Sequence, residues 1–295
     1  MKKMYSRKED GIASTVGTIF ALMIFTSLLS MFMMQVVPVQ MKGNEAQHDL
    51  KVVSQFSYMR SMMDLLTLTK NSNYTTYVPI KLGAEGITLF ASPTYGQLSV
   101  FPATNNSSFQ LSLNFIDFYG NKIYANSSGS IQILLPNRYY VAEMISYENG
   151  AVIRYNIDAK NASFVMEPNI KFQYSESEGG IIISAVLQVI YGLPKSVTGM
   201  ETRNLGITYV GSSSSSYIPK NQVNITVRSN YTYGHLVLNF TKSWLDYLNR
   251  SITAAILGIP DSSVSVSEST AGTLNIKGVV RVNIETVYFE VEIGT

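Results

Sequence analysis

The chain has 295 residues, of which 46% are hydrophobic and 14% are charged, and its 22 basic and 20 acidic side chains give a formal net charge of +2. A chain of this length and composition buries a sizeable core, which excludes extensive disorder. The nearly balanced charge argues against a nucleic-acid partner. Because there is no cysteine, disulfides, thiolate metal sites and cysteine nucleophiles are excluded.

The N-terminus combines a basic leader, residues 1–11, with a long uncharged segment. No residue from Gly11 to Met41 is charged, and the apolar part from Ile12 to Met34 would extend roughly 34 Å as a helix, enough to cross a bilayer core. We therefore assign residues 12–40 to a transmembrane helix. The charged leader residues are Lys2, Lys3, Arg7, Lys8, Glu9 and Asp10. Their positive excess predicts a cytoplasmic N-terminus and an extracytoplasmic body at the cell surface.

A secretory signal peptide is the alternative interpretation of this segment. Such a peptide has an apolar region of about 7 to 15 residues that ends in small residues at the cleavage site. The apolar run here is longer, and its far end, residues 31–38, contains no pair of small residues. Retention of the helix in the mature protein is the favoured prediction.

The junction resembles the class III signal of type IV pilins and archaellins, where a short basic leader ends in Gly or Ala directly before the apolar helix. The matching residues are Lys8-Glu9-Asp10-Gly11 and then Ile12-Ala13-Ser14-Thr15-Val16-Gly17-Thr18-Ile19, close to the Val-Ser-x-Val-x-Gly start of many archaeal pilin-like proteins. The resemblance implies cleavage between Gly11 and Ile12 by a prepilin-type peptidase. Val16 stands at the fifth mature position, where bacterial type IV pilins usually have Glu.

Several later fragments are similar to blocks of uncharacterised archaeal membrane-anchored proteins that share this start. They are residues 45–48, 79–83, 92–98 and 147–152. The resemblance supports location and class and implies no catalytic residue. The length of the mature chain favours a minor pilin, a tip adhesin or a non-assembling surface protein over a major pilin.

Small residues in the membrane helix recur every four positions, at Ala13, Gly17 and Ala21, and so share one helix face. Such a face permits close approach of another helix. Packing against copies of this chain or other pilin-like subunits and simple membrane anchorage both remain open. Pro38 lacks a backbone donor and is expected to kink or end the helix.

Residues 41–70 are expected to form an amphipathic helix that packs on the outer domain. Its apolar positions are Leu50, Val53, Phe56, Met59, Met63 and Leu66, spaced by three and four. Its polar face is expected to hold Glu45, Asp49, Lys51, Gln55 and Arg60. We interpret His48 as a solvated or capping side chain.

Residues 71–210 change to an alternating pattern that predicts a β-rich, sandwich-like or barrel domain. The expected strands are 87–91, 97–101, 109–118, 131–135, 139–147, 151–157, 163–166 and 180–191. Asn149-Gly150 predicts a tight hairpin.

A Ser-rich stretch, Ser212 to Ser216, is interpreted as an exposed loop or linker over residues 211–221. Residues 222–295 are then expected to form a small β-β-α-β-β module. Its helix places Trp244, Leu248, Ile252 and Ile256 on one face. A change of apolar phase past Thr286 in the last strand predicts a bulge near that residue. The whole chain is therefore assigned to the α+β class.

Sequons for N-linked glycans lie only beyond the membrane helix, at about twice the number expected by chance. The candidates are Asn73, Asn105, Asn106, Asn126, Asn161, Asn224, Asn230 and Asn249, with Asn239 the poorest because it falls in an expected strand.

The sequence contains no known motif for catalysis or metal binding. His48 and His235 are far apart, and no zinc-protease, nucleophile-elbow or calcium-loop spacing occurs. The Glu176/Glu178 and Glu290/Glu292 pairs are interpreted as solvated surface, and we expect no catalytic residue, cofactor or metal.

The favoured function is that of a structural or adhesive surface protein, either a pilin-like subunit or a pilin-derived anchor. The alternative is a membrane-anchored envelope glycan-binding module or hydrolase, with exposed Tyr and Trp244 on glycans, although Trp244 fits better in the core.

Overall fold

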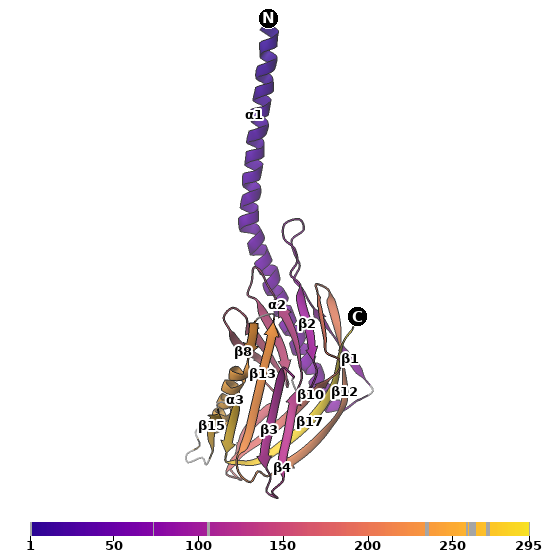
Figure 1. Ribbon diagram of the computed structural model, residues 1–295, viewed down its shortest axis with the longest axis vertical. Helices are drawn as coiled ribbons and strands as arrows, with labels where there is room; N and C mark the ends of the chain where they lie inside the picture. The colour runs from indigo at the N-terminus through magenta and orange to yellow at the C-terminus, as the bar shows by residue number, and fades with distance from the viewer. Residues whose placement is uncertain are drawn as a thin grey trace.

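The computed structural model describes residues 2–72, 74–104, 107–233, 236–257, 259, 264–269 and 272–294. A long N-terminal helical column is followed by a β-rich body with two sheets, which confirms the α+β class (Figure 1). The helices are α1 (Lys2–Met31), the π-helical turn η1 (Phe32–Val36), α2 (Val37–Thr69) and α3 (Thr241–Ala255). The strands are β1 (Thr75–Lys81), β2 (Gly96–Phe101), β3 (Phe109–Ile116), β4 (Lys122–Ser128), β5 (Ser130–Leu135), β6 (Glu143–Glu148), β7 (Ala151–Asn156), β8 (Asn161–Met166), β9 (Ile170–Ser175), β10 (Gly180–Tyr191), β11 (Lys195–Gly199), β12 (Thr202–Tyr217), β13 (Val223–Tyr233), β14 (Leu236–Asn239), β15 (Ser265–Ser269), β16 (Thr273–Lys277) and β17 (Val279–Ile293).

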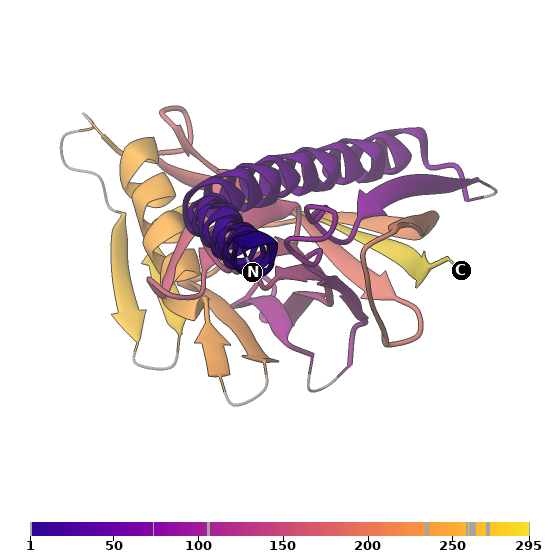
Figure 2. The same cartoon turned by 90° about the horizontal axis from the view of Figure 1, so that it is seen from above.

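The helical column changes direction where it meets the body. Seen from the N-terminal end, α1 points at the viewer while α2 runs sideways across the body (Figure 2). The N–H of Val37 bonds to the carbonyl of Phe32 five residues earlier, so the turn before Pro38 is widened. This wide turn accommodates a residue that has no N–H and whose ring crowds the preceding turn. The expected kink is present, but the helix does not end at Pro38 because α2 continues to Thr69.

The larger sheet joins strands from distant parts of the chain. Among the described residues it has eleven strands in the order β1-β12-β17-β10-β4-β3-β13-β16-β15, with β9 paired to β10 and β14 to β13. Strand β17 lies between β12, its antiparallel neighbour, and β10, its parallel neighbour. Strand β13 likewise pairs with β3. The segment expected to form a separate C-terminal module therefore contributes its strands to the main sheet. This segment has three described strands after α3, where two were expected.

The Ser-rich stretch is part of this sheet, so its interpretation as a loop or linker is wrong. Ser212 to Ser216 belong to β12 and pair in register with β17, from Val287 to Asn283. Strand β1 covers only the first half of β12, up to Thr208, so the serines occupy an open edge. A run of identical side chains has no alternation, which is why the strand was not visible in the sequence.

The smaller sheet, in the order β11-β2-β5-β6-β7-β8, is covered on both faces of its central strands. Every residue of β5 and β6 is buried. Leu134 and Met144 point into a core shared with β3, β13 and α3, which we call the distal core. Ile133 and Ile145 point into a second core under α2, which we call the proximal core. The two sheets thus share two hydrophobic cores.

Strand β17 crosses from one core to the other. Val282 and Ile284 lie in the distal core, whereas Val287 and Phe289 lie in the proximal core. The pairing of β17 with both neighbours is continuous through Thr286. The nearest irregularity is in β12, where the register with β17 shifts between Tyr209 and Gly211, opposite Phe289 and Tyr288. The extra residue is in β12, so the prediction that a bulge in the last strand near Thr286 causes the phase change is wrong. The apolar phase changes because opposite faces of the same regular strand are buried at its two ends.

Two further strand predictions need correction. Residues 87–91 form a turn closed by one bridge between Ile87 and Ala91, and Leu89 is almost fully exposed. The strand expected from Tyr139 begins only at Glu143, because the preceding N–H groups bond to a side chain of α2. The hairpin at Asn149-Gly150 is confirmed, with φ of 47° and 80° joining β6 and β7.

Candidate functional site

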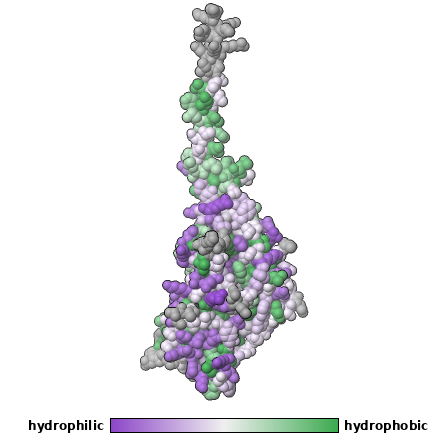
Figure 3. Space-filling view, in the orientation of Figure 1, coloured by the Kyte–Doolittle hydropathy of each residue, from purple (hydrophilic) through white to green (hydrophobic). Residues whose placement is uncertain are grey.

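The apolar part of α1 projects away from the body with its side chains exposed. Phe20, Ile24, Phe25 and Leu28 are each 61–63% exposed. From Ser14 onward the helix is long and apolar enough to cross a membrane, and none of its most apolar stretch is buried (Figure 3). The anchoring segment expected from the sequence is therefore consistent with the structure.

The expected processing and packing residues lie on this projecting helix. Gly11 and Ile12 fall within the helical backbone of α1, and their side chains lie outside the described part. A Cβ at Gly17 would meet nothing within 4 Å, and Ala21 is exposed. Within the described part, this face is open for another helix.

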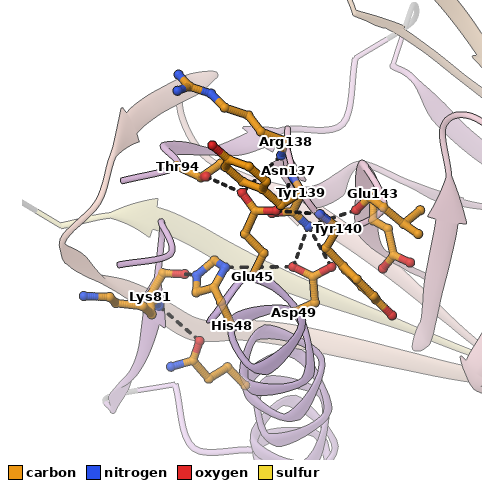
Figure 4. A network of polar contacts seen from close by, with 12 residues as sticks. Glu45, His48, Asp49, Lys81, Thr94, Asn137, Arg138, Tyr139, Tyr140 and Glu143 are labelled. Atoms are coloured by element: carbon orange, nitrogen blue, oxygen red, sulfur yellow. Dashed lines mark hydrogen bonds and ion pairs between the residues drawn. The ribbon is translucent and has the colours of Figure 1, made fainter. Parts of the chain in front are cut away.

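Where α2 enters the body, Glu45 is fully buried, not on a solvated face as expected. Its carboxylate accepts a hydrogen bond from the Thr94 hydroxyl at 2.6 Å. It also accepts three backbone N–H bonds, from Arg138 at 3.1 Å, Tyr139 at 2.8 Å and Tyr140 at 2.7 Å (Figure 4). The loop 136–142 therefore covers Glu45, and its N–H groups take the place of the water that was expected around this side chain.

Asp49 and His48 extend the same contacts one turn along α2. Asp49 is fully buried and accepts two hydrogen bonds from Asn137, so the prediction that it is solvated is wrong. His48 is 7% exposed and lies inside α2, so the prediction that it is a solvated or capping side chain is also wrong. The Nε2 of His48 lies 3.1 Å from the carbonyl of Lys81 in β1 and donates to it, since a carbonyl only accepts (Figure 4). We call Glu45, His48 and Asp49 with these partners the junction network.

Burial affects the three titratable groups of the junction network differently. Burial opposes ionisation of Glu45, but the hydrogen bonds from Thr94 and the loop outweigh it and hold its pKa below the usual value. Burial raises the pKa of Asp49 to about 7 against the opposing effect of Asn137. Burial lowers the pKa of His48, only partly offset by its bond to Lys81. At neutral pH, Glu45 is ionised and His48 is neutral.

The junction network connects the helical column to both sheets. Glu45 and Asp49 hold the loop before β6 of the smaller sheet, while His48 holds β1 of the larger one. Within the described residues, no group of three or more His, Asp or Glu side chains is placed to hold a metal ion. The hydrogen bonds of the junction network therefore fix the start of α2 against both sheets.

A further buried carboxylate, Glu148, lies at the end of β6 in the distal core. It accepts hydrogen bonds from the hydroxyls of Ser146, Ser229 and Tyr231 and, at 2.6 Å, from the indole N–H of Trp244. Burial raises the pKa of Glu148 although these bonds favour its ionised form. No pattern in the sequence indicated this site, because a Glu before Asn-Gly is typical of an exposed turn.

Trp244 has no exposed surface and packs with Phe109 and Phe164. The prediction that it belongs to the core is confirmed, and it is not available to contact a glycan. It shares the buried face of α3 with Leu248 and Ile252, as the helical spacing indicated.

The sequons differ in accessibility. Asn126, Asn161 and Asn249 are exposed, whereas Asn224 and Asn230 are half-buried in β13. Asn73, Asn105 and Asn106 lie outside the described residues. Asn239 is exposed, but its side chain accepts the N–H of Thr241 at the start of α3.

Comparison with known proteins finds no matching family model, curated protein or solved structure.

Proposed function

We propose that this chain is a cell-surface protein that displays its β-rich, sandwich-like body on a membrane-inserted helix, either as a pilin-like subunit or as a pilin-derived anchor. In this proposal the leader is cytoplasmic, the body is extracytoplasmic and a prepilin-type peptidase cleaves between Gly11 and Ile12. The accessible sequons at Asn126, Asn161 and Asn249 would carry glycans in a glycosylating host.

The observation that carries the proposal is the exposed apolar helix. A soluble monomer rarely exposes a contiguous apolar surface of this extent, and such surfaces mark membrane or protein contacts. The helix continues through η1 into α2, where Val52, Phe56, Met59 and Met63 are fully buried in the proximal core. The exposed apolar helix is therefore continuous with a helix that forms part of the core of the body.

The mature N-terminus tests the proposal. The chain is expressed in a host that has a prepilin-type peptidase, and the purified protein is analysed by mass spectrometry. We expect a chain that begins at Ile12, and we expect Gly11→Trp to block the cut while Ser6→Trp, elsewhere in the leader, does not. An intact Met1 or a cut after Met34 in the unaltered protein would contradict the pilin-like route.

The two versions of the proposal differ in helix packing. A subunit needs its small-residue face, so Gly17→Leu should abolish filaments or crosslinked oligomers, whereas Met23→Leu, on a different face of α1, should leave them unchanged. Electron microscopy and crosslinking in membranes report the difference. Monomers in the unaltered protein would favour the lone anchor.

A further inference from the structure

The end of the body opposite α1 contains a pocket of about 950 Å³, which we call the distal pocket. It is formed where β3 ends, β4 and β13 begin, and β16 turns into β17 (Figure 1). Three lysines and four carboxamide side chains line it. Among the described residues no carboxylate does so.

The lysines of the distal pocket are Lys122, Lys220 and Lys277, and all three are exposed. Within the described part of the chain, none of them forms an ion pair with a carboxylate. Asp117, which lies nearby in sequence, is 6% exposed and accepts two hydrogen bonds from Asn121. Asp117 forms a β-bridge with Pro219 at the edge of the pocket and stays ionised, because its hydrogen bonds hold its pKa below the usual value. One carboxylate beside three lysines leaves an excess of positive charge, which favours an anionic ligand.

Carboxamides form a row across the sheet beside these lysines. Asn224 of β13 lies directly opposite Asn114 of β3 and Asn275 of β16, and Tyr124 of β4 lies opposite Asn114. Residues opposite one another in a sheet point to the same side, so these four side chains share one face. That face is the outer one, because the adjacent positions Leu113, Ile225 and Leu274 point into the distal core.

Two of these residues have features suited to a polyhydroxylated ligand. The Oδ1 of Asn224 is buried at the pocket wall without a hydrogen-bond partner in the described part of the structure. A buried polar atom of this kind is normally satisfied by a partner, and a ligand hydroxyl would supply one. The ring of Tyr124 is 68% exposed at the pocket and offers an apolar surface with a hydroxyl at its end.

We propose that the distal pocket binds an acidic carbohydrate. Its carboxylate, sulfate or phosphate group pairs with Lys122, Lys220 and Lys277, its hydroxyls bond to the carboxamides, and the apolar face of a sugar ring lies on Tyr124. The position opposite the membrane helix favours a soluble or cell-surface glycan over a lipid headgroup. The inference goes beyond the display function and depends only on the body, so it stands or fails independently of leader processing.

The test uses the full chain in detergent, produced in a host without N-glycosylation because Asn224 belongs to a sequon. Isothermal titration calorimetry compares an oligogalacturonate and a heparin oligosaccharide with maltohexaose, with inorganic sulfate and with an acidic peptide of matched charge. We expect at least one acidic oligosaccharide to bind at least tenfold more tightly than all three comparison ligands. Its affinity should fall as salt rises from 50 to 500 mM, because exposed charges are screened.

Matched variants assign the binding to the pocket. The triple variant K122Q/K220Q/K277Q should lose about tenfold or more in affinity, whereas K51Q/K171Q/K242Q, with the same change in net charge elsewhere on the surface, should bind as the unaltered protein does. Tyr124→Ser should lose about threefold to tenfold, whereas Tyr58→Ser, on α2, should not. Equal losses in the two triple variants, equal binding of sulfate or the acidic peptide, or no binding of any acidic oligosaccharide at millimolar concentration would overturn the proposal.

Discussion

Both carboxylate oxygens of Asp49 on α2 accept hydrogen bonds from a single donor, the Nδ2 of Asn137, at 3.0 and 2.9 Å. The same amide group also donates to the carbonyl of Val141, which fixes the loop before β6. A fully buried carboxylate with one neutral donor is poorly compensated. This explains why the pKa of Asp49 rises to about 7 while that of Glu45, one turn away with four donors, falls.

The first prediction concerns pH. The pKa of Asp49 is about 7 in the folded state against 3.8 for the free group, so the native state binds more protons between these values. The free energy of unfolding should therefore fall as pH rises from about 4 to about 7, by at most about 4 kcal/mol, relative to Asp49→Asn. Urea unfolding of both proteins at several pH values, followed by the fluorescence of Trp244, measures this difference.

His48 acts in the opposite direction. The pKa of His48 is lowered in the folded state, so the unfolded state binds a proton at a higher pH than the native state does. The contribution of neutral His48 to the free energy of unfolding is therefore lost as pH falls below about 6.5. Both proteins retain His48, so its effect cancels in the comparison. A stability difference between the two that is independent of pH would show that Asp49 does not titrate as expected.

The second prediction concerns Glu45. Glu45→Gln replaces one of the two accepting oxygens with an N–H₂ group, which donates and does not accept. At least one backbone N–H between Arg138 and Tyr140 therefore loses its acceptor. We expect a loss of about 2–4 kcal/mol in the free energy of unfolding. Thr94→Val removes one hydrogen bond and keeps the charge, so it should cost about 1–2 kcal/mol. Equal costs for the two variants would contradict the central role of the carboxylate.

The helices and most central strands could be predicted because their periodicity is local. α2 and α3 have apolar side chains at helical spacing, and β10 is rich in β-branched residues, including the run Ile181-Ile182-Ile183. The sequence could not show that Glu45 and Asp49 are buried. Their partners are the loop at Arg138 and the side chain of Asn137, about ninety residues away, and only folding brings them together.

The pairing of the strands was equally hidden. The phase change in β17 was visible in the sequence, but two explanations fit it, a bulge or a strand that serves two cores. Choosing between them requires knowing that Val282 faces the core beside α3 and Val287 the core beneath α2. The same limit applies to Glu148, whose donors Ser229 and Trp244 come from the C-terminal segment.

The third prediction concerns Glu148 and Trp244, which is the only tryptophan in the chain. Trp244→Phe removes the indole N–H and leaves the buried carboxylate with one donor fewer, so we expect a loss of about 2–4 kcal/mol in the free energy of unfolding. Glu148→Gln should cost a similar amount. A double-mutant cycle, followed by far-ultraviolet circular dichroism, should give a coupling energy of about 1–2 kcal/mol. Additive costs would show that the hydrogen bond contributes nothing beyond the packing of each side chain.

The fourth prediction separates backbone strain from contact at the β6–β7 hairpin. Gly150 has φ of 80°, and a Cβ there would lie 2.5 Å from the Nδ2 of Asn169. Gly120 has a comparable φ of 89° but open space around it. Gly120→Ala should therefore cost about 1–2 kcal/mol from strain alone, and Gly150→Ala about 1–2 kcal/mol more.

The extra cost at Gly150 has a structural consequence for the helical column. Asn169 accepts a hydrogen bond from Arg60 at 3.1 Å and donates to Asp64 at 3.3 Å, both on α2. Displacing Asn169 should weaken the attachment of α2, so hydrogen exchange should increase in α2 in Gly150→Ala and not in Gly120→Ala. Equal unfolding costs and unchanged exchange in both variants would mean that Asn169 moves aside freely and that the hairpin does not help to hold the helix.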